Sequence, residues 1–181
     1  MEYKEWRESK EFLALLIHLY GKMLVKNPRS FVFLPLADSC IKAGRLKLAS
    51  EIINRGLSYN PRLRSALLLK ARVLLAQGKP ESAENIINPI IEKQPDNYLA
   101  RKLMAETCLK LNKPGEGIKH LEYVRKATGG KYIRKDLLLQ LETANKNQEK
   151  LVFEANEGKK ENLVNTLERW LSNAGKMMIR E

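Results

Sequence analysis

The sequence has few of the residue types that build disulfide frameworks, metal sites or catalytic centres. It contains two cysteines and two histidines among 181 residues. Cys40 and Cys108 lie far apart, without a CxxC motif or a histidine at metal-ligand spacing, so both are expected to be small buried hydrophobic residues. His18 and His120 have no serine, cysteine or carboxylate at a recognisable catalytic spacing. We therefore expect no cofactor, no metal and no enzymatic activity.

Long apolar runs and phosphate-binding loops are also missing. The stretch from Phe12 to Tyr20 is too short to span a bilayer, and the carboxylates ahead of it argue against a signal peptide. Gly129-Gly130-Lys131 lacks the rest of the phosphate-loop pattern. These absences predict a protein without a membrane span, in the reducing cytoplasm.

Acidic residues are in the minority. The chain has 33 Lys and Arg against 21 Asp and Glu, a formal net charge of +12, and half of this excess lies in residues 29–95. A basic surface attracts nucleic acid, anionic lipid or acidic protein segments, and charge alone does not choose between them. Arg62, Arg64, Lys70 and Arg72 form one such cluster, but base-stacking aromatics beside it are missing. RNA binding is therefore the less favoured interpretation.

What the chain does have is an internal repeat of about 34 residues. Several series of small, apolar and turn residues recur in phase, and proline or glycine marks each boundary. The members are Ala37, Ala71 and Ala105; Cys40, Leu74 and Cys108; Gly44, Gly78 and Asn112; Ala49, Ala83 and Gly117; Ile53, Ile87 and Leu121; and the boundary residues Pro28, Pro61, Pro95 and Gly129. So many series in one phase indicate a repeat architecture rather than chance.

Each unit is expected to form two helices. In the second unit an apolar stripe at helical spacing runs from Leu67 to Leu75, and Gln77-Gly78-Lys79 ends it. Pro80 suits the first position of the next helix, where its missing N–H would be unpaired anyway. Small residues at Ala71 and Ala83 allow the two helices to pack closely.

These positions resemble the signature of the tetratricopeptide repeat. The small first-helix residue, the turn glycine, the second-helix alanine and the closing proline of the family are matched by Ala37, Ala71 and Ala105, by Gly44 and Gly78, by Ala49 and Ala83, and by Pro61 and Pro95. The resemblance implies an all-α fold, a right-handed α-solenoid of antiparallel helix pairs, with units at 29–61, 62–95 and 96–128. The third unit departs from the pattern at Asn112, Gly117 and Gly129, so it is expected to be the loosest or to lie at a capped end.

Helical segments are expected on both sides of the repeats. Residues 1–28 are interpreted as an N-terminal helix or degenerate half repeat, and residues 129–144 as a capping helix. Residues 145–162 are polar and fit either a linker or a helix extension. Residues 163–181 are expected to form an amphipathic helix with Leu163, Leu167, Trp170, Leu171 and Ala174 on one stripe. The stretch 166–171 resembles the C-terminal segment of some bacterial tetratricopeptide proteins.

The resemblance also implies a binding groove, because the first helices of such repeats line the concave side. Carried over position by position, its residues are Phe31, Leu34, Asp38, Ile41, Lys42, Ser65, Leu68, Arg72, Leu75, Ala76, Leu99, Lys102, Glu106, Leu109 and Lys110. Seven of these are large and apolar, and exposed apolar surface marks interaction sites. Arg72 and Lys102 are expected to be available to a carboxylate of the ligand.

The carboxylate clamp of the co-chaperone members of the family is absent. The places of its lysines and asparagines are taken by Leu34, Asp38, Leu69, Leu99 and Leu103. A role as a co-chaperone of heat-shock proteins is therefore not expected.

The sequence thus predicts a protein-interaction scaffold or adaptor that binds an apolar or amphipathic peptide, helical or extended, in the concave groove. Two occupants remain open, a foreign protein and the chain's own C-terminal helix acting as a displaceable plug. Pairing of two copies through the terminal helices also remains open, and the alternative function is a basic solenoid that binds RNA or another anionic surface.

Overall fold

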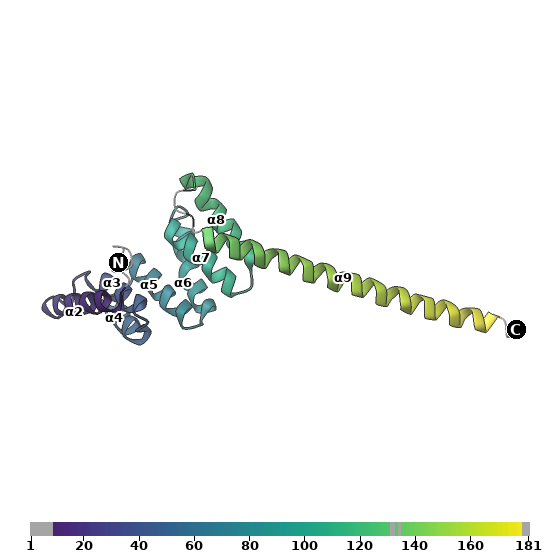
Figure 1. Cartoon of the computed structure of the whole chain (residues 1–181), viewed down its shortest axis with the longest axis horizontal. Helices are drawn as coiled ribbons and strands as arrows, with labels where there is room; N and C mark the ends of the chain where they lie inside the picture. Colours follow the sequence, from purple (N-terminus) through teal and green to yellow (C-terminus); the bar gives the residue numbers. More distant parts are fainter. Residues whose placement is uncertain (1–8, 131–132, 134, 179–181) are drawn as a thin grey trace.

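The computed structural model describes residues 9–130, 133 and 135–178. Within these residues it contains helices and no strands (Figure 1). The helices are α2 (Lys10–Lys26), α3 (Phe33–Lys42), α4 (Leu46–Tyr59), α5 (Arg64–Ala76), α6 (Pro80–Lys93), α7 (Tyr98–Lys110), α8 (Pro114–Thr128) and α9 (Lys135–Met178). The all-α solenoid expected from the repeat is confirmed.

The helix pairs α3–α4, α5–α6 and α7–α8 follow the period of the sequence. Each pair is joined by a tight turn in which one residue has a positive φ: Gly44 at 72°, Gly78 at 73° and Asn112 at 57°. Asparagine is among the few residues with a side chain that tolerate this left-handed conformation, so the turn is kept in the third unit without glycine. Pro80 and Pro114 are the first residues of α6 and α8, as the pattern predicts for Pro80.

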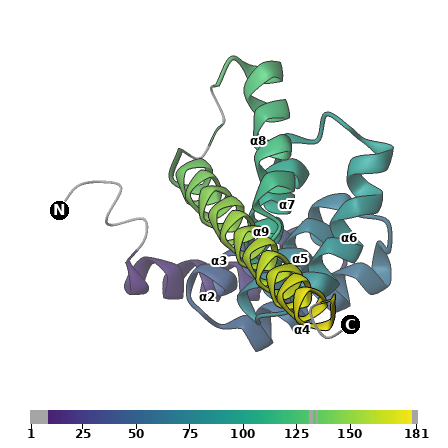
Figure 2. The same ribbon diagram turned by 90° about the vertical axis from the view of Figure 1, so that its right-hand side faces the viewer.

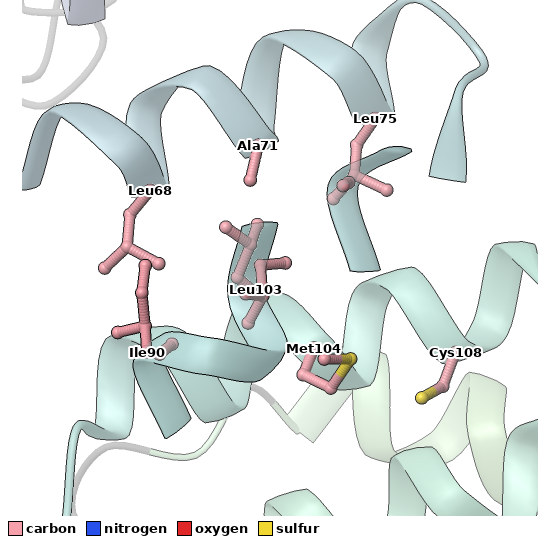
Figure 3. Packing of buried hydrophobic residues seen from close by; sticks show 10 residues of the cluster. Leu68, Ala71, Leu75, Ile90, Leu103, Met104 and Cys108 are labelled. Atoms are coloured by element: carbon pink, nitrogen blue, oxygen red, sulfur yellow. The ribbon is translucent and has the colours of Figure 1, made fainter. Parts of the chain in front are cut away.

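The small residues of the pattern lie where helices approach most closely. Ala37, Ala71 and Ala105 in the first helices, and Ala49 and Ala83 in the second helices, are fully buried. Figure 3 shows the central part of this core, in which residues of α5, α6 and α7 meet. Removing apolar surface from water in this way is the main force that holds such a stack together.

The stack is closed at each end by a single helix. At the N-terminal end α2 packs on α3, with Ile17, Tyr20 and Leu24 against the core of the first unit. At the other end the first turns of α9 pack on α7 and α8, where Leu137 and Leu141 are buried. The third unit therefore lies next to a capped end.

Helix α9 continues far beyond this cap. It has 44 residues, which corresponds to roughly 66 Å at 1.5 Å per residue. Residues 145–162 lie inside this helix, so they form a helix extension and not a linker. Figures 1 and 2 show that α9 leaves the repeats and runs outward as an isolated helix.

Both cysteines are buried and unpaired with each other, in agreement with their interpretation as small core residues. Burial raises the pKa of the Cys40 thiol. Burial, together with the nearby carboxylates of Glu116 and Glu84, raises the pKa of Cys108 to about 11. Neither thiol is therefore primed for reaction near neutral pH.

We expect both thiols of the folded protein to resist alkylation and disulfide exchange. At pH 8 the shifted pKa of Cys108 alone lowers its thiolate fraction about a hundredfold relative to an unfolded thiol, and burial slows reagent access further. A thiol-titration time course, in buffer and in denaturant, measures this. The Cys40→Ala and Cys108→Ala variants assign each phase, and prompt labelling of either thiol in the folded protein would contradict the expectation.

Candidate functional site

The first helix of each pair lines one shared face of the stack. α3 contacts α5, α5 contacts α7, and α7 contacts α9, whereas within the described residues α4, α6 and α8 do not contact one another. Helices that touch in succession lie on the inner side of a curved stack, and those that are splayed apart lie on the outer side. The inner face is therefore formed by α3, α5 and α7, the helices from which the groove residues were predicted.

The structure distributes the predicted groove residues over three environments. Exposed are Phe31, Lys42, Ser65, Ala76, Leu99 and Lys110; half-buried are Leu34, Asp38, Ile41, Arg72, Lys102, Glu106 and Leu109; buried are Leu68 and Leu75. Thirteen of the fifteen positions thus reach the surface, and two do not.

Leu68 and Leu75 require a correction to the predicted groove. They are only 4% and 5% exposed, and Figure 3 shows both side chains leaving α5 on the side where Ile90, Leu103 and Met104 lie. The reason is the position of α5 in the middle of the stack, where it contacts α3, α4, α6 and α7. These two leucines hold units together and are not available to a ligand.

The inner face carries more charge and less apolar surface than the sequence suggested. Of the large apolar candidates only Phe31 and Leu99 are more than half exposed, at 57% and 55%. Leu34, Ile41 and Leu109 are half-buried and contribute part of their side chains to the surface. An amphipathic ligand therefore fits this face better than a wholly apolar one.

An ion pair links the first two units across the inner face. Arg72 Nη1 lies 2.5 Å from Asp38 Oδ1, and Lys42 Nζ lies 2.9 Å from Asp38 Oδ2. Burial alone would raise the pKa of the Asp38 carboxyl, but its hydrogen bonds with Lys42 and Arg72 outweigh burial, and the pKa is below its usual value. Arg72 is thus engaged by Asp38, which corrects the expectation that it is free for a ligand carboxylate.

Two further cations of this face are not neutralised in this way. Lys102 and Lys110 lie on α7, and among the described residues neither is in an ion pair with a carboxylate. Together with Leu99, Glu106 and Leu109 they form a strip along α7 that carries two cations, one carboxylate and two apolar side chains. Such a strip offers an apolar contact and a partner for negative charge side by side.

Comparison with known families now identifies the repeat. Residues 42–124 match the family model described as anaphase-promoting complex, cyclosome, subunit 3, a model of tetratricopeptide-like repeats. The repeats of this chain are tetratricopeptide-like. No curated protein was found to match it. Repeats of this family generally serve as scaffolds for contacts between proteins.

One surface feature of these tetratricopeptide units was missed at the level of sequence. A cleft, called here the aromatic cleft, opens at the connection between α4 and α5. It is lined by Phe31, Tyr59, Asn60, Pro61, Arg62 and Leu63. Tyr59 is 43% exposed, and the guanidinium of Arg29 lies over its ring at 5.6 Å from the centroid. The sequence does contain a signal for this cleft. The first unit has the aromatic residues Phe31 and Tyr59 at the positions where the next unit has Ser65 and Lys93.

Among the described residues, no further helix covers the inner face. α9 contacts only α7 and α8 among the described helices, and Leu151, Val152 and Phe153 on it are exposed. The predicted stripe from Leu163 to Ala174 belongs to the helical backbone of α9, but its side chains, except those of residues 165 and 166, lie outside the described part. No helix among the described residues is both long and apolar enough to pass through a bilayer.

Proposed function

We propose that this tetratricopeptide-repeat protein is an adaptor that binds a segment of a partner protein along its inner face. The observation that carries the proposal is the uncovered face of α3, α5 and α7. Each of these helices contacts only its neighbours in the stack, and no other helix of the described residues crosses the face. A surface that is partly apolar and left open in this way is typical of interaction sites.

The chemistry of the face indicates what the segment carries. Leu99 and Leu109 offer apolar contact, and Lys102 and Lys110 offer positive charge beside it. The segment is therefore amphipathic, with apolar side chains on one side and carboxylates near α7. It adopts a helix or an extended strand, the two forms in which peptide segments are commonly recognised by folded proteins.

The course of α9 favours a foreign partner over the chain's own C-terminal helix. For the stripe between Leu163 and Ala174 to reach the inner face, α9 would have to break and reverse direction, whereas it continues as one helix through this region (Figure 2). We therefore propose a segment of a partner protein, and not the C-terminal helix, as the occupant of the inner face. The two free thiols fit a reducing compartment, and we place the protein in the cytoplasm as part of the proposal.

A photo-crosslinking experiment tests this proposal on the full-length chain. A photoreactive amino acid at Ala76, which is exposed on the inner face, should crosslink a partner from native lysate, and one at Lys119, on the outer helix α8, should not. Adding Leu99→Glu and Lys102→Glu should reduce recovery of that partner about tenfold, since they replace an apolar contact and a cation by negative charge.

The control replaces Lys119 by glutamate, the same substitution as Lys102→Glu but on the outer surface. Unchanged recovery from that variant, with loss from the inner-face variant, supports the adaptor. Equal recovery from all three proteins would remove the inner face as the binding surface. Greater recovery after removal of residues 145–181 would show instead that the C-terminal helix competes for the face.

A further inference from the structure

The connection between α4 and α5 carries an unusual combination of exposed aromatic and basic groups. Phe31 and Tyr59 are both exposed and line the aromatic cleft together with Pro61 and Leu63. The cleft lies at the edge of the stack, beside the end of the inner face where Phe31 precedes α3. It is therefore a surface of its own, built from connections and helix ends.

Four arginines lie in the segments that form or adjoin the cleft. Arg62 lines it and Arg29 lies over Tyr59. Arg55 precedes Tyr59 by one turn on the same face of α4, and Arg64 begins α5. All four are exposed, and within the described residues none is in an ion pair with a carboxylate. Residues 29–64 contain seven basic and two acidic residues, so no local excess of carboxylates offsets them.

The backbone adds positive charge at the same place. Helix α5 begins directly after the cleft, and its N-cap residue, Leu63, provides no side-chain hydrogen bond. The first amide N–H groups of a helix have no partner within the helix and carry a partial positive charge. At α5 these groups and the Arg62 guanidinium therefore attract the same negative group.

At the equivalent connection of the next unit, between α6 and α7, the chain itself supplies a helix cap and a carboxylate. At the start of α7, the N-cap Asn97 accepts a hydrogen bond from the amide N–H of Ala100 at 3.0 Å. The preceding residue is Asp96, whose carboxylate accepts a hydrogen bond of 2.5 Å from Tyr123. There the cap and the negative charge come from the chain itself, and Arg101 stacks on Tyr123 at 3.5 Å from the ring centroid.

The two connections are thus equivalent in the repeat and opposite in charge. Arg62 stands where the next unit has Asp96, and Leu63 stands where it has the capping Asn97. The α4–α5 connection lacks the carboxylate and the capping side-chain oxygen that the α6–α7 connection has, and it carries an open apolar cleft. Both differences are complementary to one kind of ligand, a chain that brings carboxylates and an apolar side chain together.

We propose that the aromatic cleft binds an acidic linear segment of a partner protein. One apolar side chain of the segment lies in the cleft against Phe31, Tyr59 and Leu63. Its neighbouring carboxylates accept hydrogen bonds from Arg62 and from the N-terminal amides of α5. This site shares Phe31 with the edge of the inner face, but its other residues lie outside that face, and it does not depend on the adaptor function proposed there.

A protein segment fits the cleft better than a nucleic acid does. Arg29 already covers one face of the Tyr59 ring, which limits it as a platform for a base. The remaining lining of Phe31, Pro61 and Leu63 is apolar and suits an aliphatic or aromatic side chain. Nucleic acid is therefore treated as an outcome that the experiment can detect.

Fluorescence anisotropy with defined probes tests the site in the full-length protein. The probes are fluorescein-labelled peptides in which aspartates flank one central Leu, Ile, Phe, Tyr or Trp, a matched set with lysines in place of the aspartates, and oligouridine RNA. Arg62→Asp and Phe31→Ser each introduce the residue that the next unit has at the equivalent position. Lys119→Asp, on α8, is the control for Arg62→Asp because it changes the net charge by the same amount.

At least one aspartate peptide should bind the wild-type protein, and no lysine peptide should. Arg62→Asp and Phe31→Ser should each weaken this binding about tenfold, the size of one charge-assisted or apolar anchor, and Lys119→Asp should leave it within about twofold. Circular dichroism verifies that the variants are folded. Absence of binding by every aspartate peptide overturns the proposal. So does equal weakening by Lys119→Asp, unchanged binding by Phe31→Ser, or RNA binding that is tighter and equally sensitive to Arg62→Asp.

Discussion

Leu68→Glu is expected to unfold the chain rather than to weaken the binding of a partner. Leu68 is 4% exposed and packs among Ala71, Ile90 and Leu103 in the central core cluster. A carboxylate placed there meets no cation, so it is either buried unpaired or must be protonated. The cost is about 3–5 kcal/mol on top of the lost leucine packing, which is a large part of the stability of an ordinary domain.

Leu99→Glu is the matched comparison for this prediction. Leu99 is at the start of α7, 55% exposed, and was predicted from the same pattern to line the same groove. A charge there stays in water, so the stability of this variant should remain within about 0.5 kcal/mol of the wild type. Urea unfolding followed by circular dichroism separates the two outcomes. A Leu68→Glu protein with wild-type stability would mean that Leu68 faces solvent and that the groove is apolar, as first predicted.

The contrast between these two leucines shows what the sequence could specify. The period, the turns and the small residues at helix contacts were all predictable, because each has one strong physical requirement. Asn112 is an instructive case, since it breaks the glycine pattern yet keeps the positive φ that the turn needs. The stack of helix pairs follows from such local rules.

The orientation of α5 was not predictable in the same way. Apolar residues surround this helix: Ala66, Leu68, Val73 and Leu75 are buried, and Leu67, Leu69 and Leu74 are partly buried. Its charged residues Lys70 and Arg72 are two positions apart and therefore point to nearly opposite sides, so they do not mark one face that meets solvent. Only its contacts with α3, α4, α6 and α7 decide that Leu68 and Leu75 point into the core.

The aromatic cleft was missed for a different reason. Its residues come from the segment before α3, from the end of α4 and from the connection to α5, and none shares a helical face with all the others. Arg62 and Arg64 were noticed as charges, but their relation to Phe31 and Tyr59 depends on how two units stack. Periodicity describes helix faces, and it does not describe the connections between them.

Helix α9 was ambiguous because its middle part has no apolar stripe. Residues 145–162 contain Leu151, Val152 and Phe153 as neighbours, which do not share one face of a helix. Ion pairs one turn apart, such as Lys150 Nζ to Glu154 Oε1 at 3.7 Å, stabilise a helix by only a few tenths of a kcal/mol each. Where α9 begins is fixed instead by packing, at Leu137 and Leu141.

That packing leads to a second large prediction, in which the same substitution has effects of different size in two backgrounds. Leu141 is fully buried against Ala105 and Leu121. Gly117 stands where the other units have alanine, and a Cβ atom there would lie 2.7 Å from Leu141 Cδ2. The departure from the repeat at position 117 is thus the space into which α9 docks.

Leu141→Ala alone should destabilise the protein by about 2–5 kcal/mol, since it removes buried methyl groups and leaves a cavity. Gly117→Ala alone should also destabilise it, because the clash with Leu141 costs about 1–3 kcal/mol and outweighs the helix propensity of alanine, about 1 kcal/mol. In the Leu141→Ala background the contact with Leu141 is gone, and the nearest remaining neighbour of the Cβ atom is the Ala105 carbonyl oxygen, at 3.2 Å. Gly117→Ala should then destabilise the protein less than it does in the wild type, with a coupling energy of about 1 kcal/mol or more.

Urea unfolding of the wild type, the two single variants and the double variant measures this coupling directly. Leu139→Ala serves as the control on α9, because Leu139 is 65% exposed and its loss should change stability by no more than about 0.5 kcal/mol. Equal effects of Gly117→Ala in both backgrounds would show that α9 does not dock at this glycine. A clearly smaller effect of Gly117→Ala in the Leu141→Ala background would establish that the first turns of α9 dock on α8 as part of the folded stack.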